Sequence, residues 1–242
     1  MRADVRSGVP RVGWVTDVQN DFMCPPEAGG RLYVRDLSDA ADPGAEQVRA
    51  AIERAVAWMR EHCAAMVYTT DWHSLEDDEI DAENPDPASG TYPPHCMGLS
   101  TDLDLLEGAA ILSSIRPQEP LVLEREADPA TAGIIATRAV RDGRPVVIRK
   151  NRFDVFAGNP AAEAFVLALV EELGGAVEFV VVGVARDVCV TQAIDGLQAR
   201  GLPTVGVRDA TWGLGLEPEE VTLARWSEGG RVVTLEELTS ES

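Results

Sequence analysis

Short apolar runs alternate along the chain with longer amphipathic stretches. Runs rich in β-branched residues, typical of buried strands, lie at 12–16, 64–70, 145–148, 177–184 and 204–207. Apolar residues at helical spacing lie at 45–62, at 159–173 and from about 189 to 201. This order predicts an α/β fold, a three-layer α/β/α sandwich around a mainly parallel, Rossmann-like sheet.

Two segments fit this alternation less well. Residues 76–89 are acidic and contain prolines, so we expect a surface loop. Residues from about 113 to 144 hold an apolar run at 121–123 and a helix-like run at 130–140, which we interpret as an ordered insertion. With 242 residues and 45% hydrophobic content, the chain can bury one sizeable core, and we expect residues 1–242 to form a single domain.

The net charge of the chain limits the classes of partner that it can bind. A formal net charge of -20 argues against nucleic acid as a partner, because phosphate binding needs clustered basic residues. The N-terminus has no long apolar stretch of signal or membrane type, and the four cysteines form no C-x-x-C pair. These features predict a soluble, reduced, cytoplasmic protein with no membrane partner, and they leave homo-oligomerisation open.

Lys150 is the one lysine in a chain that otherwise uses arginine for its basic side chains. An ammonium is a compact charge whose pKa can be shifted, whereas a guanidinium stays charged, and this difference suits catalysis. Lys150 follows the apolar run at 145–148, so it lies at the carboxyl end of a predicted strand, where α/β sheets bind ligands. The alternative is a lysine retained by chance on a solvated loop.

Three further polar residues lie at predicted strand ends. Asp17, Asp71 and Cys189 follow the runs at 12–16, 64–70 and 177–184, so a parallel sheet should bring them to the edge that carries Lys150. Cys189 begins a predicted helix, where unpaired amides and the dipole favour the nucleophilic thiolate. Backbone amides of the same turn are candidates for an oxyanion hole. The alternative for Cys189 is a small, buried apolar residue.

Two histidines suggest a metal site. Asp71 and His73 are two residues apart at a strand end, and His95 follows a rigid Pro-Pro turn from which it can fold back. Two imidazoles and a carboxylate form an open site for one divalent ion, with zinc ranked slightly ahead of iron and manganese. The alternative is a solvated pair of histidines.

Taken together, these residues resemble the isochorismatase-like cysteine hydrolases, within them the nicotinamidase (pyrazinamidase) branch. The similar blocks are D-V-Q-N-D-F at 17–22, T-D-W-H at 70–73, Y-P-P-H-C at 92–96, Lys150 after its strand, and G-V-A-R-D-V-C-V at 183–190. The resemblance extends from about residue 12 to residue 209.

The resemblance implies a site. Its members would use a catalytic triad, here Asp17, Lys150 and Cys189, and a divalent metal at Asp71, His73 and His95. It also implies a cis peptide between Val184 and Ala185, and aromatic walls at Phe22 and Tyr92 for a planar substrate. We expect the amides of Ala185 and Cys189 to form the oxyanion hole.

The implied activity is hydrolysis of a small carboxamide, with nicotinamide as first choice, to the acid and ammonia through a thioester. The sequence departs from the branch pattern at Tyr92, where tryptophan is usual, and at Asn151, where glycine usually follows the lysine. These changes leave open another small amide or an N-carbamoyl compound. Two different functions also stay open: a metal-free vinyl-ether hydrolase, which Cys189 disfavours, and a non-catalytic binding protein that retains the fold.

Overall fold

The computed structural model describes residues 8–241, which contain a seven-stranded sheet in the order β3-β4-β2-β1-β5-β6-β7. Every pairing between neighbouring strands is parallel. The strands are β1 (Arg11–Thr16), β2 (Ala65–Asp71), β3 (Leu121–Leu123), β4 (Val146–Lys150), β5 (Glu178–Val184), β6 (Thr204–Trp212) and β7 (Gly230–Val233). The predicted parallel α/β sheet is confirmed.

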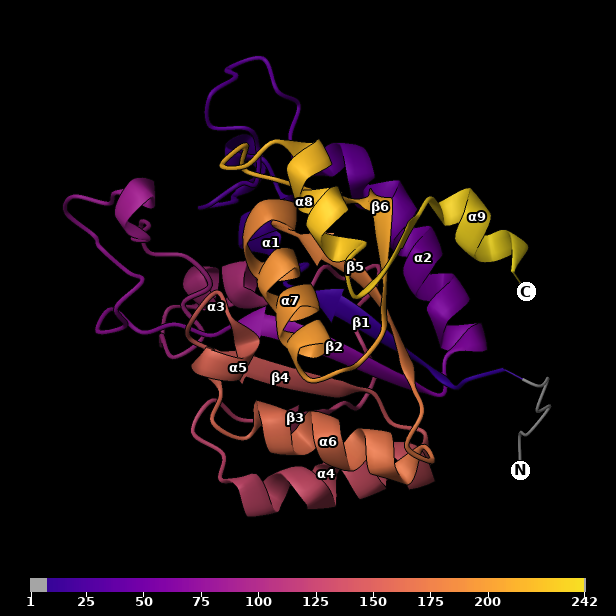
Figure 1. Cartoon of the computed structure of the whole chain (residues 1–242). Coiled ribbons are helices and arrows are strands. Elements are labelled where there is room, and N and C mark those ends of the chain that lie inside the picture. The colour runs from indigo at the N-terminus through magenta and orange to yellow at the C-terminus, as the bar shows by residue number, and fades with distance from the viewer. Residues whose placement is uncertain (1–7, 242) are drawn as a thin grey trace.

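Helices cover both faces of this sheet (Figure 1). They are α1 (Asn20–Met23), α2 (Arg49–His62), α3 (Leu103–Ala109), α4 (Pro129–Asp142), α5 (Val155–Gly158), α6 (Ala162–Glu172), α7 (Thr191–Ala199), α8 (Glu219–Trp226) and α9 (Leu235–Ser240). One core cluster joins the sheet to α2 and α9, and the other joins it to α4, α6, α7 and α8. The molecule is therefore a three-layer sandwich.

Strand β5 shows why a continuous apolar run forms this structure. Successive side chains of a strand point to opposite faces, so a strand covered on both faces must be apolar throughout. Phe179 and Val181 enter the cluster with α6 and α7, while Val180, Val182 and Val184 enter the cluster with α2.

The segment 113–144 belongs to the sheet. Its apolar run is β3, which pairs with β4 at one edge, and its helix-like run is α4, which packs beside α6 (Figure 1). The acidic segment 76–89 was predicted to be a surface loop, and this is wrong for two residues, since Asp77 and Glu79 are buried. Their carboxylates have partners in distant parts of the chain, described below.

The strand order places the site. On one side of β1 lie β2, β4 and β3, and on its other side lie β5, β6 and β7. The strand order therefore reverses direction between β1 and β5. Helices α2 and α7, which flank this reversal, pack on opposite faces. Such a reversal leaves a crevice beyond the carboxyl ends of the strands, where ligands bind in open α/β sheets. Between residues 8 and 241, no helix is both long and apolar enough to span a membrane.

Candidate active site

Asp17, Asp71 and Lys150 come from three adjacent strands. Asp71 and Lys150 are register partners at the ends of β2 and β4, and Asp17 directly follows β1. Asp17 adopts a left-handed conformation with φ of 50°, and its carboxylate Oδ1 accepts a hydrogen bond of 2.6 Å from the Thr69 hydroxyl. The turn after β1 thus aims this carboxylate at the neighbouring strands.

The Lys150 ammonium lies between two carboxylates. Its Nζ is 2.9 Å from Asp17 Oδ2 and donates a hydrogen bond to Asp71 Oδ1, and all three side chains are buried. Burial lowers the pKa of Lys150, but Asp17 and Asp71 outweigh this effect and raise the pKa well above its usual value. Burial raises the pKa of Asp17, so this carboxylate is a stronger base than an exposed one.

Cys189 completes this cluster from the other side of β1. It lies in a π-helical turn (Arg186–Val190) between β5 and α7, and its Sγ is 3.9 Å from Lys150 Nζ. We expected a thiolate at the start of this helix, but burial raises the pKa of Cys189 well above its usual value, and the Asp17 charge raises it further. The resting group is therefore a thiol, adjacent to a base that can take its proton. The peptide between Val184 and Ala185 is cis.

Asp71, His73 and His95 form a buried group suited to a metal ion. Their ligand atoms lie within 4.8 Å of one another, and the Nε2 atoms of His73 and His95 are 3.8 and 3.9 Å from Asp71 Oδ2. His73 Nε2 is buried without a hydrogen-bond partner. This donor set and the unpaired nitrogen fit one divalent ion. Asp17, Asp71 and Cys189 also lie close together, but the Lys150 ammonium among them disfavours a cation there.

The outer nitrogens of both histidines have partners. His95 Nδ1 is 2.7 Å from the Pro93 carbonyl oxygen, an acceptor that requires Nδ1 to carry the proton. His73 Nδ1 is 3.3 Å from Asp77 Oδ2. Burial lowers the pKa of His95 to about 4, which keeps this ring neutral. Burial also lowers the pKa of His73, but the adjacent Asp71 and Asp77 carboxylates raise it to about 9 when no metal is bound.

Gln19, which the sequence did not single out, fixes the backbone of Asp71. Its side-chain Oε1 accepts from the Asp71 amide at 2.8 Å, and its Nε2 donates to the Asp71 carbonyl oxygen at 2.9 Å. Nε2 also donates to the Ala109 carbonyl oxygen at 2.7 Å. The one available signal was its place in the D-V-Q-N-D-F block, three residues after β1.

Glu79 is a second residue that sequence reasoning missed. Its Oε1 accepts from the Phe153 amide at 2.9 Å, whereas its Oε2 is buried without a partner. Burial raises the pKa of Glu79 to about 7, and the nearby Asp71 carboxylate adds to this effect. The acidic composition of 76–89 concealed this residue, because one buried carboxylate among many exposed ones has no distinguishing pattern.

A small apolar pocket opens onto the Cys189 thiol. It is lined by Phe22, Leu32, Val34, Tyr92, His95, Phe153, Ala185, Val188, Cys189 and Leu214. The Phe22 and Tyr92 rings, which we expected as walls, flank His95 with centroid distances of 5.3 and 6.2 Å. Phe153 adds a third wall, with its ring 5.6 Å from that of Tyr92.

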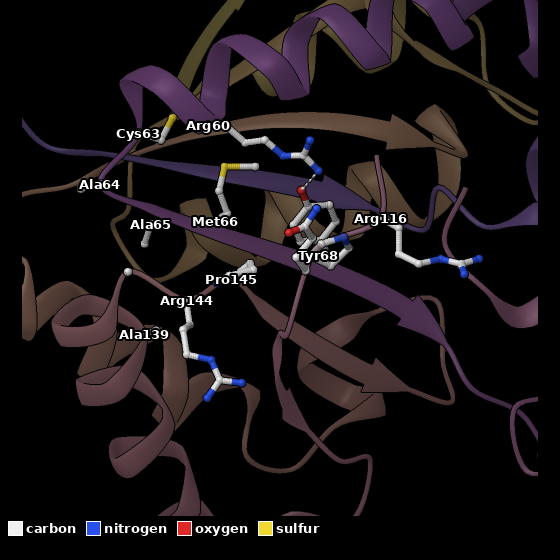
Figure 2. Close-up of a pocket in the computed structure, with 13 residues that line it drawn as sticks. Arg60, Cys63, Ala64, Ala65, Met66, Tyr68, Arg116, Ala139, Arg144 and Pro145 are labelled. Atoms are coloured by element: carbon white, nitrogen blue, oxygen red, sulfur yellow. Dashed lines mark hydrogen bonds between the residues drawn. The ribbon is translucent and has the colours of Figure 1, made fainter. Parts of the chain in front are cut away.

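A larger hollow lies at the opposite, amino end of the strands, far from this chemistry (Figure 2). Three arginines line it, but each guanidinium binds a backbone carbonyl: Arg60 that of Ile115, Arg116 that of Ile111, and Arg144 that of Glu119. Arg116 and Arg144 extend in different directions (Figure 2). These arginines hold the 111–120 segment, and size alone does not make this hollow the active site.

Known proteins resemble this chain in sequence profile and in fold. The profile of the isochorismatase domain matches residues 14–237. No curated protein sequence matches the chain. The fold is similar to that of a nicotinamidase/pyrazinamidase from Bacillus subtilis, with 18% identity, a TM-score of 0.62, and coverage of 93% of this chain and 99% of the other.

Two further solved structures are similar. A pyrazinamidase from Pyrococcus horikoshii in complex with zinc is 22% identical, with a TM-score of 0.61 and coverage of 93% of this chain and 98% of the other. An N-carbamoylsarcosine amidase from Thermoplasma acidophilum is 20% identical, with a TM-score of 0.59 and coverage of 94% and 97%. At these identities the likeness shows the fold.

Proposed function

Because the chain belongs to the isochorismatase family of hydrolases, we propose that it is a cysteine amidohydrolase whose substrate is a small, planar carboxamide. Nicotinamide is the first candidate. The observation that carries this proposal is the buried Asp17–Lys150–Cys189 cluster at the inner end of an aromatic pocket.

In the first half of the reaction, Asp17 takes the proton of the Cys189 thiol, and the sulfur attacks the carboxamide carbon. Lys150, 3.9 Å from Sγ, compensates the charge that develops on sulfur. The amides of Ala185 and Cys189 hold the oxyanion of the tetrahedral intermediate. The C–N bond then breaks, and ammonia leaves with the proton from Asp17.

The second half releases the acid. Asp17, now ionised again, takes a proton from a water molecule that attacks the thioester carbon. The C–S bond breaks, the carboxylic acid leaves, and the sulfur regains its proton from Asp17. One base thus serves both halves, which agrees with the raised pKa of Asp17.

Asp71, His73 and His95 would hold one divalent ion, which when bound supplies a contact that orients a ring nitrogen of the substrate. Zinc is ranked first, followed by iron and manganese. His95 serves twice, because its ring also lines the pocket. The Phe22 and Tyr92 rings would hold the substrate plane between them.

The pocket lining favours an aromatic amide over an N-carbamoyl amino acid. A substrate with a free carboxylate needs a cationic partner when it leaves water, and among residues 8–241 those that line the pocket include no arginine or lysine, so such a carboxylate would depend on the metal ion. A neutral ring can instead be enclosed by Phe22, Tyr92 and Phe153.

The test is ammonia release from a panel of amides by the purified protein, with its metal content measured in parallel. The panel should contain nicotinamide, pyrazinamide, benzamide and N-carbamoylsarcosine. We expect turnover of the two ring-nitrogen amides above that of benzamide. Ammonia from none of the four would favour a binding protein that retains the fold, and preference for N-carbamoylsarcosine would overturn the substrate assignment.

A further inference from the structure

The orientation of His73 depends on a carboxylate outside the metal ligands. His73 Nδ1 is 3.3 Å from Asp77 Oδ2, while the unpaired Nε2 faces Asp71. A carboxylate can only accept at this position, so Asp77 holds the proton on Nδ1 and leaves the lone pair of Nε2 for a metal. The corresponding acceptor for His95 Nδ1 is the main-chain carbonyl of Pro93. The backbone itself fixes this acceptor, so no second side chain has to hold it in place.

Asp77 is in turn held by Arg125. The guanidinium donates from Nη1 to Oδ2 at 2.8 Å and from Nη2 to Oδ1 at 2.9 Å, a two-point contact that fixes the plane of the carboxylate. The Ser74 amide also donates to Oδ2, at 2.9 Å. The side chains of Arg125 and Asp77 are only 13% and 6% exposed, so water contributes little to this arrangement.

Arg125 also contacts the ligand segment directly. Its Nη1 donates to the carbonyl oxygen of Trp72 at 2.9 Å, and Trp72 is the residue between Asp71 and His73. Arg125 itself lies two residues after β3, the short strand at the sheet edge, whose pairing with β4 sets its position. One side chain from the 113–144 segment therefore touches both the backbone of the metal-ligand segment and the carboxylate behind His73.

We propose that Arg125 is a positioning residue for the divalent-metal site, acting through Asp77 on His73, and that edge strand β3 serves to deliver it. This inference rests on the proposed metal site. It assigns a function to the 113–144 segment, which otherwise only extends the sheet. Because the guanidinium contacts Asp77 and the Trp72 backbone rather than the side chains of the proposed metal ligands, its removal should alter metal binding more than the chemistry at Cys189.

The test compares Arg125→Met and Arg125→Lys with Arg152→Met, a control variant of an exposed arginine. Arg152 is ion-paired with Asp78, the neighbour of Asp77, and these two side chains are 46% and 74% exposed. Dissociation constants for Zn²⁺ and Mn²⁺ are measured on the full, metal-stripped chain by competition with a chromophoric chelator. Loss of a side chain that holds a metal ligand by hydrogen bonding weakens metal binding by about 10- to 100-fold. We expect this loss in Arg125→Met, a smaller loss in Arg125→Lys, and wild-type affinity in Arg152→Met.

A double-mutant cycle separates positioning from a general structural role. If Arg125 acts through Asp77, adding Arg125→Met to Asp77→Ala should weaken metal binding little further, whereas independent structural damage would add. The melting temperature of each metal-free variant is measured beside its metal affinity. Wild-type affinity in Arg125→Met, an equal loss in Arg152→Met, or full additivity would overturn the inference. A wild type that binds neither ion would instead refute the metal site itself.

Discussion

The two ends of the sheet hold similar charged groups in opposite surroundings. At the carboxyl end, Asp17, Asp71 and Lys150 are at most 2% exposed. At the amino end, four side chains that are 20–38% exposed form a second ion-pair cluster: Arg11, Glu178, Arg231 and Glu241. Arg11 and Glu178 are register partners that begin β1 and β5, so the two clusters share the same strands.

This difference shows what the buried cluster is for. Removing charges from water costs several kcal/mol per ion, and a buried pair often contributes nothing net to stability compared with apolar residues. Half-exposed pairs avoid that cost, but each contributes only about 0–1 kcal/mol. A fold that needed only stability would have no reason to bury Lys150 with two carboxylates, so we attribute that arrangement to chemistry.

The largest expected effect is at Cys189. Cys189→Ala should abolish amide turnover, because it removes the thiol that lines the pocket and forms the thioester, while the loss of one buried sulfur leaves the fold intact. Ammonia release measures turnover, and circular dichroism measures the fold. Mass spectrometry of the quenched wild type should show the acyl adduct on Cys189 and none on the variant. Substantial turnover by the variant would refute the thioester mechanism.

Lys150→Arg tests whether the buried cluster depends on shape as well as charge. The planar guanidinium cannot occupy the space of an ammonium between Asp17, Asp71 and Cys189 without displacing one of them. A displacement of about 1 Å at a reacting centre costs on the order of a hundredfold in rate, and we expect a loss of that size in kcat. An arginine variant with wild-type kinetics would remove Lys150 from the catalytic group.

Metal removal should have a smaller effect, expressed mainly in substrate binding. His73→Ala and His95→Ala should raise KM by about tenfold or more with a lesser change in kcat, because the metal is assigned to positioning. His73 has a raised pKa of about 9 without metal, so it must release a proton to bind the ion. Metal affinity should therefore weaken as pH falls below 9. Chelator-resistant activity would contradict the assignment.

The parts predicted from sequence share one property, a local pattern. The strands are uninterrupted apolar runs, and Asp17, Asp71 and Lys150 could be found because each lies where such a run ends. Cys189 was visible for the same reason, but its raised pKa was not, because burial beside Asp17 is set by other strands.

The parts that were missed depend on contacts between distant residues. Asp77 is buried because Arg125, 48 positions away, neutralises it, and Gln19 is buried because it bonds the backbone of Asp71, 52 positions away. Neither of these contacts produces a periodic pattern in the sequence. An acidic, proline-containing segment such as 76–89 has the composition of a surface loop, whether or not two of its carboxylates turn inward.

The smallest expected effect is at the amino end and completes the comparison. Glu241 accepts from Arg11 Nη2 at 2.6 Å and from Arg231 Nη2 at 2.9 Å, and its hydrogen bonds, chiefly with Arg231, lower its pKa to about 2. The ordinary pKa of a glutamate is about 4.3, so the contribution of Glu241 to stability is present above about pH 5 and is lost as pH falls towards 2.

Because the Glu241 carboxylate is partly exposed and screened by salt, we expect Glu241→Gln to lower the free energy of unfolding by less than about 1 kcal/mol at pH 7. Urea unfolding at pH 7 and pH 3 measures this difference, which should shrink at the lower pH, and kcat should not change at pH 7. A loss of several kcal/mol would contradict the small contribution to stability that we assign to this cluster, and a changed kcat would contradict the assignment of chemistry to the buried cluster alone.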